Sequence, residues 1–191
     1  MNILQSALSF SHTLLSNAVK PGDRVIDATM GNGHDTLFLA QLVGDSGHVD
    51  AFDIQKQALT STSGLLEKNQ IAKNTYTLHQ ASHDTIAKTV PASEPISAAI
   101  FNLGYLPGGD KTVITHKDSS LNAIKQCLDL LSPHGLVIVV LYYGHEGGVE
   151  EKNAILQFAS QLDQHKFNVM TYQFINQVQA PPICLAFEKR K

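Results

Sequence analysis

The chain has 191 residues, 43% of them hydrophobic, which suits one domain with enough apolar side chains for its own core. Its apolar runs are far shorter than the roughly 20 residues that a membrane-spanning helix needs, so we expect a soluble protein that does not contact a membrane. The net charge of −3 excludes the overall basic field of many nucleic-acid-binding proteins, but not a local basic patch such as Lys111 with Lys117 or residues 189–191.

The start of the chain resembles neither a signal peptide nor a linker. It has no lysine or arginine before Lys20, and this predicts a cytoplasmic protein. Hydrophobic residues recur at helical spacing within residues 1–20, so we expect an N-terminal helix packed on the domain. Cys127 and Cys184 lie in apolar segments without the spacing of a zinc site or redox pair, which predicts buried free thiols.

Strand-like and helix-like segments then alternate almost to the end of the chain. The alternation indicates βαβ units around a mainly parallel sheet, within a single domain of residues 1–191. Strands are expected at 24–28, 48–53, 75–79, 96–102, 136–141, 168–175 and 183–187. Helices are expected at 35–43, 56–69, 84–89, 119–131 and 149–164.

The last two predicted strands have only residues 176–182 between them, too few for a helix. They should therefore form an antiparallel hairpin at the edge of the sheet. A seven-stranded, mainly parallel α/β sheet that ends in such a hairpin, with helices on both faces, resembles the Rossmann-like fold of class I methyltransferases. Fold alone does not establish function, which has to come from the site.

The first strand runs into a glycine-containing loop, residues 29–33, that leads into the helix near Asp35. This loop lies at the carboxyl ends of the strands, where open α/β sheets bind ligands. Gly31 and Gly33 allow backbone angles and a close ligand approach that a Cβ would prevent. A Gly-x-Gly pair alone is equally consistent with an ordinary strand-to-helix turn.

The second strand ends in an acid, Asp53, which follows Gly33 by 20 residues. An acid at this position accepts hydrogen bonds from both hydroxyls of a ribose. Gln55 is close enough to contact the ribose or the adenine. A solvated strand end is the alternative interpretation of Asp53, and the spacing favours ribose binding.

Both NAD-dependent dehydrogenases and S-adenosylmethionine (SAM)-dependent methyltransferases use such a loop. Dehydrogenases place a third small residue where the pyrophosphate meets the helix, and here that position is Thr36. SAM has no phosphate, but its ammonium group would be attracted by Asp27 or Asp35. The loop therefore favours SAM over NAD, and an NAD-dependent oxidoreductase is the alternative from another enzyme class.

Further candidate residues follow the third and fourth strands. Ser82 and His83 lie where methyltransferases contact the adenine, although a surface loop histidine is an alternative for His83. The loop after Asn102 is polar and rich in glycine, as expected where a methyl acceptor binds. Asn102-Leu-Gly-Tyr105 resembles the Asn/Asp-Pro-Pro-Tyr/Phe loop of amine methyltransferases without its prolines. A structural turn is the alternative.

A second glycine-rich segment, residues 142–148, follows the fifth strand and suggests a pocket wall or a lid. Its adjacent His145 and Glu146 would seldom converge on one ion and no third ligand is evident, so we predict no metal site. An acceptor amine must lose its proton before it attacks. Tyr105, Asp110 and His145 are the candidates to accept that proton.

Four segments together, 27–36, 53–55, 101–111 and 142–148, resemble the YtqB/MnmM type of class I methyltransferase, described as rRNA methylases. Some members of that family are tRNA wobble-uridine methyltransferases. The resemblance extends over essentially the whole chain, and Thr29 replaces the first glycine of the general pattern. It implies SAM-dependent methylation of the exocyclic amine of 5-aminomethyl-2-thiouridine in the tRNA anticodon arm, giving 5-methylaminomethyl-2-thiouridine.

The resemblance also implies a role for each matching residue. Asn32, Gly33, Asp35 and Thr36 would line the methionine end of SAM; Asp53 and Gln55 would bind its ribose and adenine; Ser82 and His83 would close over the base; Asn102, Gly104 and Tyr105 would face the acceptor. The alternatives are an rRNA base or a small-molecule amine as acceptor, and a noncatalytic SAM- or RNA-binding module. A homodimer is also open, because 191 residues offer little area for an RNA arm.

Overall fold

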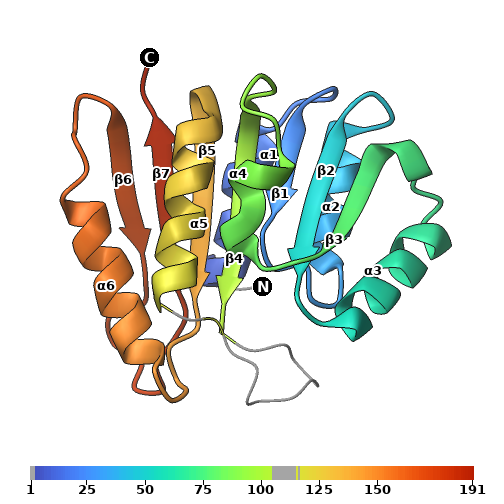
Figure 1. Ribbon diagram of the computed structural model, residues 1–191. Coiled ribbons are helices and arrows are strands. Elements are labelled where there is room, and N and C mark those ends of the chain that lie inside the picture. Colours follow the sequence, from blue (N-terminus) through green and yellow to red (C-terminus); the bar gives the residue numbers. More distant parts are fainter. Residues whose placement is uncertain (1–2, 105–114, 116) are drawn as a thin grey trace.

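The computed structural model describes residues 3–104, 115 and 117–191, in which seven strands form one sheet in the order β3-β2-β1-β4-β5-β7-β6 (Figure 1). The strands are β1 (Arg24–Asp27), β2 (His48–Asp53), β3 (Tyr76–Gln80), β4 (Ile96–Leu103), β5 (Leu131–Leu141), β6 (Phe167–Tyr172) and β7 (Ile183–Lys189). The helices are α1 (Ala7–Ala18), α2 (His34–Val43), α3 (Lys56–Lys68), α4 (Ile86–Thr89), α5 (Lys117–Leu130) and α6 (Gly148–Ser160). Two candidate residues, Tyr105 and Asp110, lie outside the described residues.

The pairing of the strands confirms the predicted topology. Strands β3, β2, β1, β4 and β5 pair in parallel, whereas β7 is antiparallel to both of its neighbours, β5 and β6. The carboxyl ends of β1, β2, β4 and β5 therefore share one edge, the lower edge in Figure 1. Because the loops that follow these four strands leave from that edge, the predicted ligand-binding residues are brought together there.

Two strand boundaries differ from the predicted ones by three residues or more. β5 begins at Leu131 instead of residue 136, because Leu131 pairs with Ile96 before a register shift that brings Leu136 opposite Ala98. Pro133 and His134, which has a φ of +64°, occupy this irregular stretch and look like a turn in the sequence. β6 ends at Tyr172 instead of residue 175.

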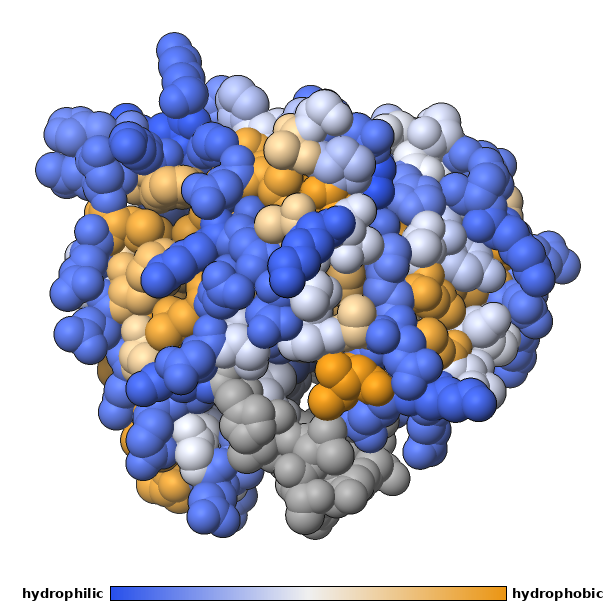
Figure 2. All heavy atoms as spheres, in the orientation of Figure 1, coloured by the Kyte–Doolittle hydropathy of each residue, from blue (hydrophilic) through white to orange (hydrophobic). Residues whose placement is uncertain are grey.

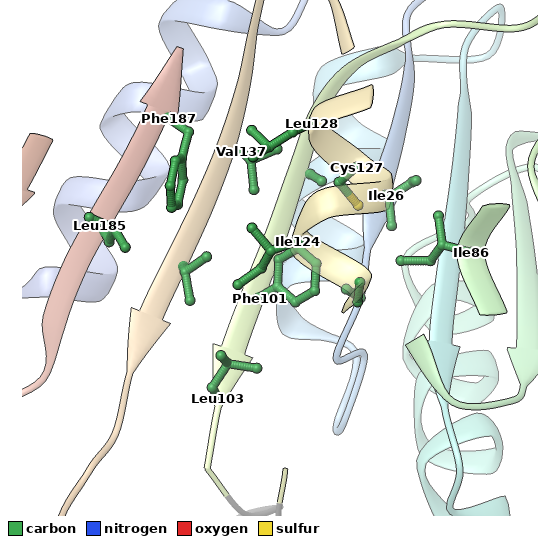
Figure 3. Close-up of a cluster of buried hydrophobic side chains, with 14 of the residues drawn as sticks. Ile26, Ile86, Phe101, Leu103, Ile124, Cys127, Leu128, Val137, Leu185 and Phe187 are labelled. Carbon is green, nitrogen blue, oxygen red and sulfur yellow. The ribbon is translucent and has the colours of Figure 1, made fainter. Parts of the chain in front are cut away.

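Apolar side chains cover both faces of the sheet, because neighbouring residues of a buried strand point to opposite sides. In β4, Ala99, Phe101 and Leu103 pack with residues of α4, α5 and α6, whereas Ala98 and Ile100 pack with residues of α1 and α2. Figure 3 shows Phe101 beside Ile124 of α5. The outer surface of the layer formed by α4, α5 and α6 is covered mostly by hydrophilic side chains, with hydrophobic patches among them (Figure 2). The sheet is thus enclosed by helices on both sides, as predicted.

The two cysteines confirm the prediction of buried free thiols, one in each layer of the core. Burial raises the pKa of Cys127 far above its usual range and that of Cys184 to about 12, so neither thiol is ionised near neutral pH. Among the described residues, none of the helices combines the length and the apolar character needed to span a membrane.

Candidate active site

Asp27 ends β1 and is completely buried beneath the glycine-containing loop. Its carboxylate accepts hydrogen bonds from Thr36 Oγ1 at 2.6 Å and from the backbone N–H of Thr29 at 3.2 Å. Burial, and then the charge of nearby Asp35, raise the pKa of Asp27 to about 7, although both hydrogen bonds favour ionisation. Thr36 is therefore the partner of a buried carboxyl group, a role that a third small residue could not fill.

Gly33 precedes α2 with a φ of +83°, which a side chain would strain. A Cβ at this position would also lie 2.7 Å from Thr62 Oγ1 and 2.9 Å from Thr62 Cα, so the loop packs directly on α3. Thr62 Oγ1 in turn donates a hydrogen bond to the carbonyl oxygen of Gly31 at 3.2 Å. The requirement for glycine is thus partly structural, since the close neighbour is α3.

Asp53, at the end of β2, joins the two loops that flank the expected adenosine site. Its Oδ2 accepts a hydrogen bond from the N–H of Gly31 at 3.1 Å, and its Oδ1 accepts one from the N–H of Gln55 at 2.8 Å. An ionised carboxylate has about four lone-pair sites, so these bonds leave acceptor capacity for a ribose. Ribose binding stays a prediction, and the described contribution of Gln55 is its backbone N–H.

His83 is buried in the 3-10 turn of residues His83–Thr85 that follows Ser82. The alternative of an exposed loop histidine is therefore wrong. The ring Nδ1 lies 3.3 Å from the carbonyl oxygen of Ala28, which assigns the proton to Nδ1, and burial lowers the pKa of the ring. Nε2 is then a buried acceptor with no hydrogen-bond partner in the described part of the chain.

Asn102, near the end of β4, is held at both its backbone and its side chain. Its N–H donates to Thr29 Oγ1 at 2.7 Å, and its side-chain Nδ2 donates to Asp35 Oδ2 at 2.5 Å. The other oxygen of Asp35 lies 2.6 Å from His12 Nε2. Asn102 Oδ1 is buried without a hydrogen-bond partner among residues 3–104, 115 and 117–191.

The segments that follow β4 and β5 meet at Gly104. A Cβ on Gly104 would lie 3.1 Å from Tyr142 Cβ and 3.9 Å from His145 Nε2. Burial and the charge of Asp35 raise the pKa of Tyr142. The His145 Nδ1 lies 2.9 Å from the backbone carbonyl oxygen of Glu146. The structure thus brings His145 close to Gly104, directly after β4, and its role at an acceptor site stays a prediction.

Glu151 of α6 is a buried acid that was not among the predicted site residues, and it holds the chain in place at Thr115. It accepts hydrogen bonds from Ser120 Oγ at 2.6 Å and from Thr115 Oγ1 at 2.9 Å. The N–H of Thr115 donates to the carbonyl oxygen of Gly104 at 3.0 Å. Gly104 and Thr115, which stand on either side of residues 105–114, are therefore hydrogen-bonded to each other, and Thr115 is also hydrogen-bonded to α6.

The described residues fit SAM in two respects. The buried Asp35, together with Asp27 when it is ionised, provides negative charge for an ammonium group, and Asp53 keeps acceptor capacity. The buried acceptors Asn102 Oδ1 and His83 Nε2 lack protein donors in the described ranges. Since an unsatisfied buried acceptor is costly, both atoms suit a ligand that brings its own donors.

A mainly parallel sheet with β7 reversed, a glycine-containing loop after β1 and an acid at the end of β2 define a class I SAM-dependent methyltransferase. The family model described as "Putative rRNA methylase" matches residues 49–188 of the chain. The chain therefore belongs to the rRNA methylase family.

Individual relatives agree with this assignment. The tRNA (mnm(5)s(2)U34)-methyltransferase, chloroplastic, of Arabidopsis thaliana is 37% identical over 97% of this chain and 70% of its own length. A putative rRNA-methylase from Clostridium thermocellum has a TM-score of 0.95 and 40% identity over 98% of this chain and 100% of that one. A putative methyltransferase from Streptococcus mutans in complex with SAH has a TM-score of 0.89 and 43% identity over 98% and 99% of the two chains. This protein is thus a SAM-dependent methyltransferase, and the dehydrogenase alternative is excluded.

Proposed function

We propose that this methyltransferase modifies the exocyclic amine of 5-aminomethyl-2-thiouridine at the wobble position of tRNA, giving 5-methylaminomethyl-2-thiouridine. The structural observation that supports an amine as the methyl acceptor is the orientation of the Asn102 side-chain amide. An ionised carboxylate only accepts hydrogen bonds, so Asp35 selects the Nδ2 side of the amide and turns the carbonyl oxygen toward another donor. The Arabidopsis relative, a tRNA (mnm(5)s(2)U34)-methyltransferase, supports the wobble uridine as the substrate.

The residues of this chain contribute mainly by holding and orienting the reactants. SAM, when bound, supplies a methyl group on a sulfonium, and methyl transfer to an amine is an in-line displacement that needs no covalent intermediate. Asp53 would hold the ribose, and the acids at Asp27 and Asp35 would attract the ammonium group. Asn102 Oδ1 would accept a hydrogen bond from the acceptor amine and so direct its lone pair.

The acceptor amine must be neutral when it attacks. His145 is the described candidate to receive its proton, because it lies beside Gly104 at the end of β4. Tyr105 and Asp110 are the other candidates and lie outside the described residues. The raised pKa of Tyr142 makes its phenolate a poor choice near neutral pH.

A second candidate function is methylation of an rRNA base, which the description of the matching family favours. Nucleosides from tRNA and rRNA of a deletion strain distinguish the two by mass spectrometry. We expect 5-aminomethyl-2-thiouridine to accumulate in tRNA, and purified protein with SAM to convert it. Normal tRNA together with a missing rRNA methyl group would overturn the proposal, as would methylation of a small-molecule amine only.

Replacing Asn102 tests the amine site directly. We expect Asn102→Ala to lower kcat on the order of 100-fold, because a misoriented acceptor loses most of the benefit of positioning. The dissociation constant for SAM should stay within about threefold, since the lost contact is to the acceptor. Single-turnover kinetics and calorimetric titration measure the two effects. Weak SAM binding with normal kcat would assign Asn102 to the cofactor instead.

We also propose that the protein acts as a homodimer in the cytoplasm. The exposed apolar side chains of Ile175 and Val178 follow β6 at the carboxyl edge of the sheet, where a partner could cover them. Light scattering on the purified protein tests the dimer, and a monomer at micromolar concentration would contradict it.

A further inference from the structure

Asp35 is the second residue of α2 and has both carboxylate oxygens engaged by residues far apart in the sequence. One oxygen lies 2.6 Å from His12 Nε2 and the other lies 2.5 Å from Asn102 Nδ2. Only 9% of the Asp35 side chain is exposed, so water competes little for either bond. The Asp35 carboxylate therefore links the position of the His12 ring to that of the Asn102 amide.

His12 comes from α1, which is otherwise a packing helix on the face of the sheet. Its ring stacks on Phe38 of α2, with the centroids 4.1 Å apart and the planes 13° apart. Stacking fixes the plane of the imidazole, and the fixed plane directs Nε2 at Asp35. The N-terminal helix is thus connected to the active site by one hydrogen bond and one aromatic contact.

We infer that His12 is a positioning residue for methyl transfer, which acts through Asp35 to fix the orientation of the Asn102 side-chain amide. The two ends of that amide differ only in being donor or acceptor, and Asp35 decides between them. Without His12, the Asp35 carboxylate gains freedom to rotate away from Asn102. The amide could then turn, and its Nδ2 would take the place of the oxygen that receives the acceptor amine. This inference rests on the proposed amine acceptor.

Two variants separate the hydrogen bond from the stacked ring. His12→Phe keeps an aromatic ring on Phe38 but removes the donor, whereas His12→Gln keeps a donor nitrogen at similar reach but removes the ring. We expect His12→Phe to lower kcat on the order of 10- to 100-fold, and His12→Gln to stay within about threefold of the unchanged protein. His165→Gln, far from the site after α6, is the matched control.

The measurements are kcat and KM with tRNA from a deletion strain, the dissociation constant for SAM by calorimetry, and the unfolding temperature. Positioning predicts a lower kcat for His12→Phe with SAM affinity within about threefold of normal. A merely structural role predicts the reverse order, with His12→Gln less stable and less active than His12→Phe. That order, or normal kcat in His12→Phe, would overturn the inference.

A double-mutant cycle with Asn102→Ala tests whether His12 acts through Asn102. In the Asn102→Ala background, adding His12→Phe should change kcat less than about twofold, because the amide that His12 positions is already gone. Additive losses would refute the link between the two residues. Failure of the proposed function is a separate result, in which the unchanged protein does not convert 5-aminomethyl-2-thiouridine at all.

Discussion

Asp53 accepts two backbone N–H bonds and still has lone pairs for a ligand, and we propose that it holds the ribose of SAM as well as the two loops. We expect Asp53→Ala to weaken SAM binding about 100-fold, because two charge-assisted hydrogen bonds of roughly 1.5 kcal/mol each are lost. Calorimetric titration measures the affinity, and the unfolding temperature shows whether the loops are preserved. Glu67→Ala, on the exposed side of α3, is the control. Unchanged affinity would exclude Asp53 from the ribose site.

Asp27 places an ionisable group where its charge is disfavoured in the folded protein. Its pKa rises from 3.8 to about 7 on folding, so the native state binds the extra proton between these values. The stabilising contribution of that proton is full below pH 3.8 and is lost as the pH rises through about 7. Ionised Asp27 therefore makes the protein less stable in the pH range in which its charge would help to bind SAM.

Asp27→Asn tests this dependence on pH. An asparagine can accept from the Thr29 N–H and donate to the Thr36 hydroxyl, so its hydrogen bonds can be satisfied. We expect the unfolding temperature of Asp27→Asn, relative to the unchanged protein, to increase between about pH 5 and about pH 8. Thermal unfolding at several pH values measures it. A difference that does not vary with pH would show that Asp27 is ionised throughout.

Local patterns in the sequence predicted the residues of the glycine-containing loop and Asp53, because those residues lie at fixed positions around strand ends. The sequence did not predict His12 or Glu151. His12 is 23 positions before Asp35, and Asp35 is 67 positions before Asn102, so only the packing of α1 and β4 against α2 brings the three together. In the sequence, both missed residues look like ordinary polar residues of amphipathic helices.

At the scale of the elements, the junction of the glycine-containing loop with α3 depends on the absence of a side chain at Gly33. We expect Gly33→Ala to destabilise the protein by about 2 kcal/mol or more, since positive φ and a clash with Thr62 add together. Gly64 of the same helix has no atom within 4 Å of a Cβ position. Gly64→Ala should instead stabilise by about 0.5 kcal/mol or more.

Urea unfolding of both glycine variants measures these effects, and SAM titration shows whether the loop still binds. Equal stability of the two variants would mean that the loop can move away from α3.

The alternation of strands and helices was sufficient to predict the order of the elements, because each βαβ unit is determined by local hydrophobic patterns. The short link between the last two strands predicted their antiparallel pairing, but not that β7 lies between β5 and β6. The alternation was also not sufficient to predict the start of β5. Leu131 pairs with Ile96 across an irregular stretch that contains Pro133, and such a pairing depends on the neighbouring strand. The central place of α1 against β4, β5 and β7 also depends on tertiary packing.

At the scale of the whole molecule, the two ends of the sheet shift the pKa of a buried carboxyl group in opposite directions. The pKa of Asp27 is raised at one end, and that of Asp50 is lowered at the other. Asp50, in β2 toward the amino ends of the strands, is 2% exposed and lies between Arg24 and His79. Burial favours its neutral form, but the hydrogen bond from His79 and the charge of Arg24 outweigh burial and lower the pKa of Asp50. Arg24 also pairs with Glu94. The ion cluster therefore stabilises the end of the sheet that lies away from the cofactor loop.

Asp50→Asn should cost roughly 3 kcal/mol near neutral pH, because it leaves the partly buried Arg24 without its inner partner. The folded pKa lies below 3.8, so the contribution of Asp50 is present above pH 3.8 and is lost as the pH falls through the folded pKa. Urea unfolding should thus show a large difference at about pH 6 that shrinks below about pH 4, opposite in direction to the Asp27→Asn series. Glu94→Gln, which removes the more exposed partner, should cost less than about 1 kcal/mol. If Asp50→Asn also weakened SAM binding, the two ends of the sheet would be coupled instead of independent.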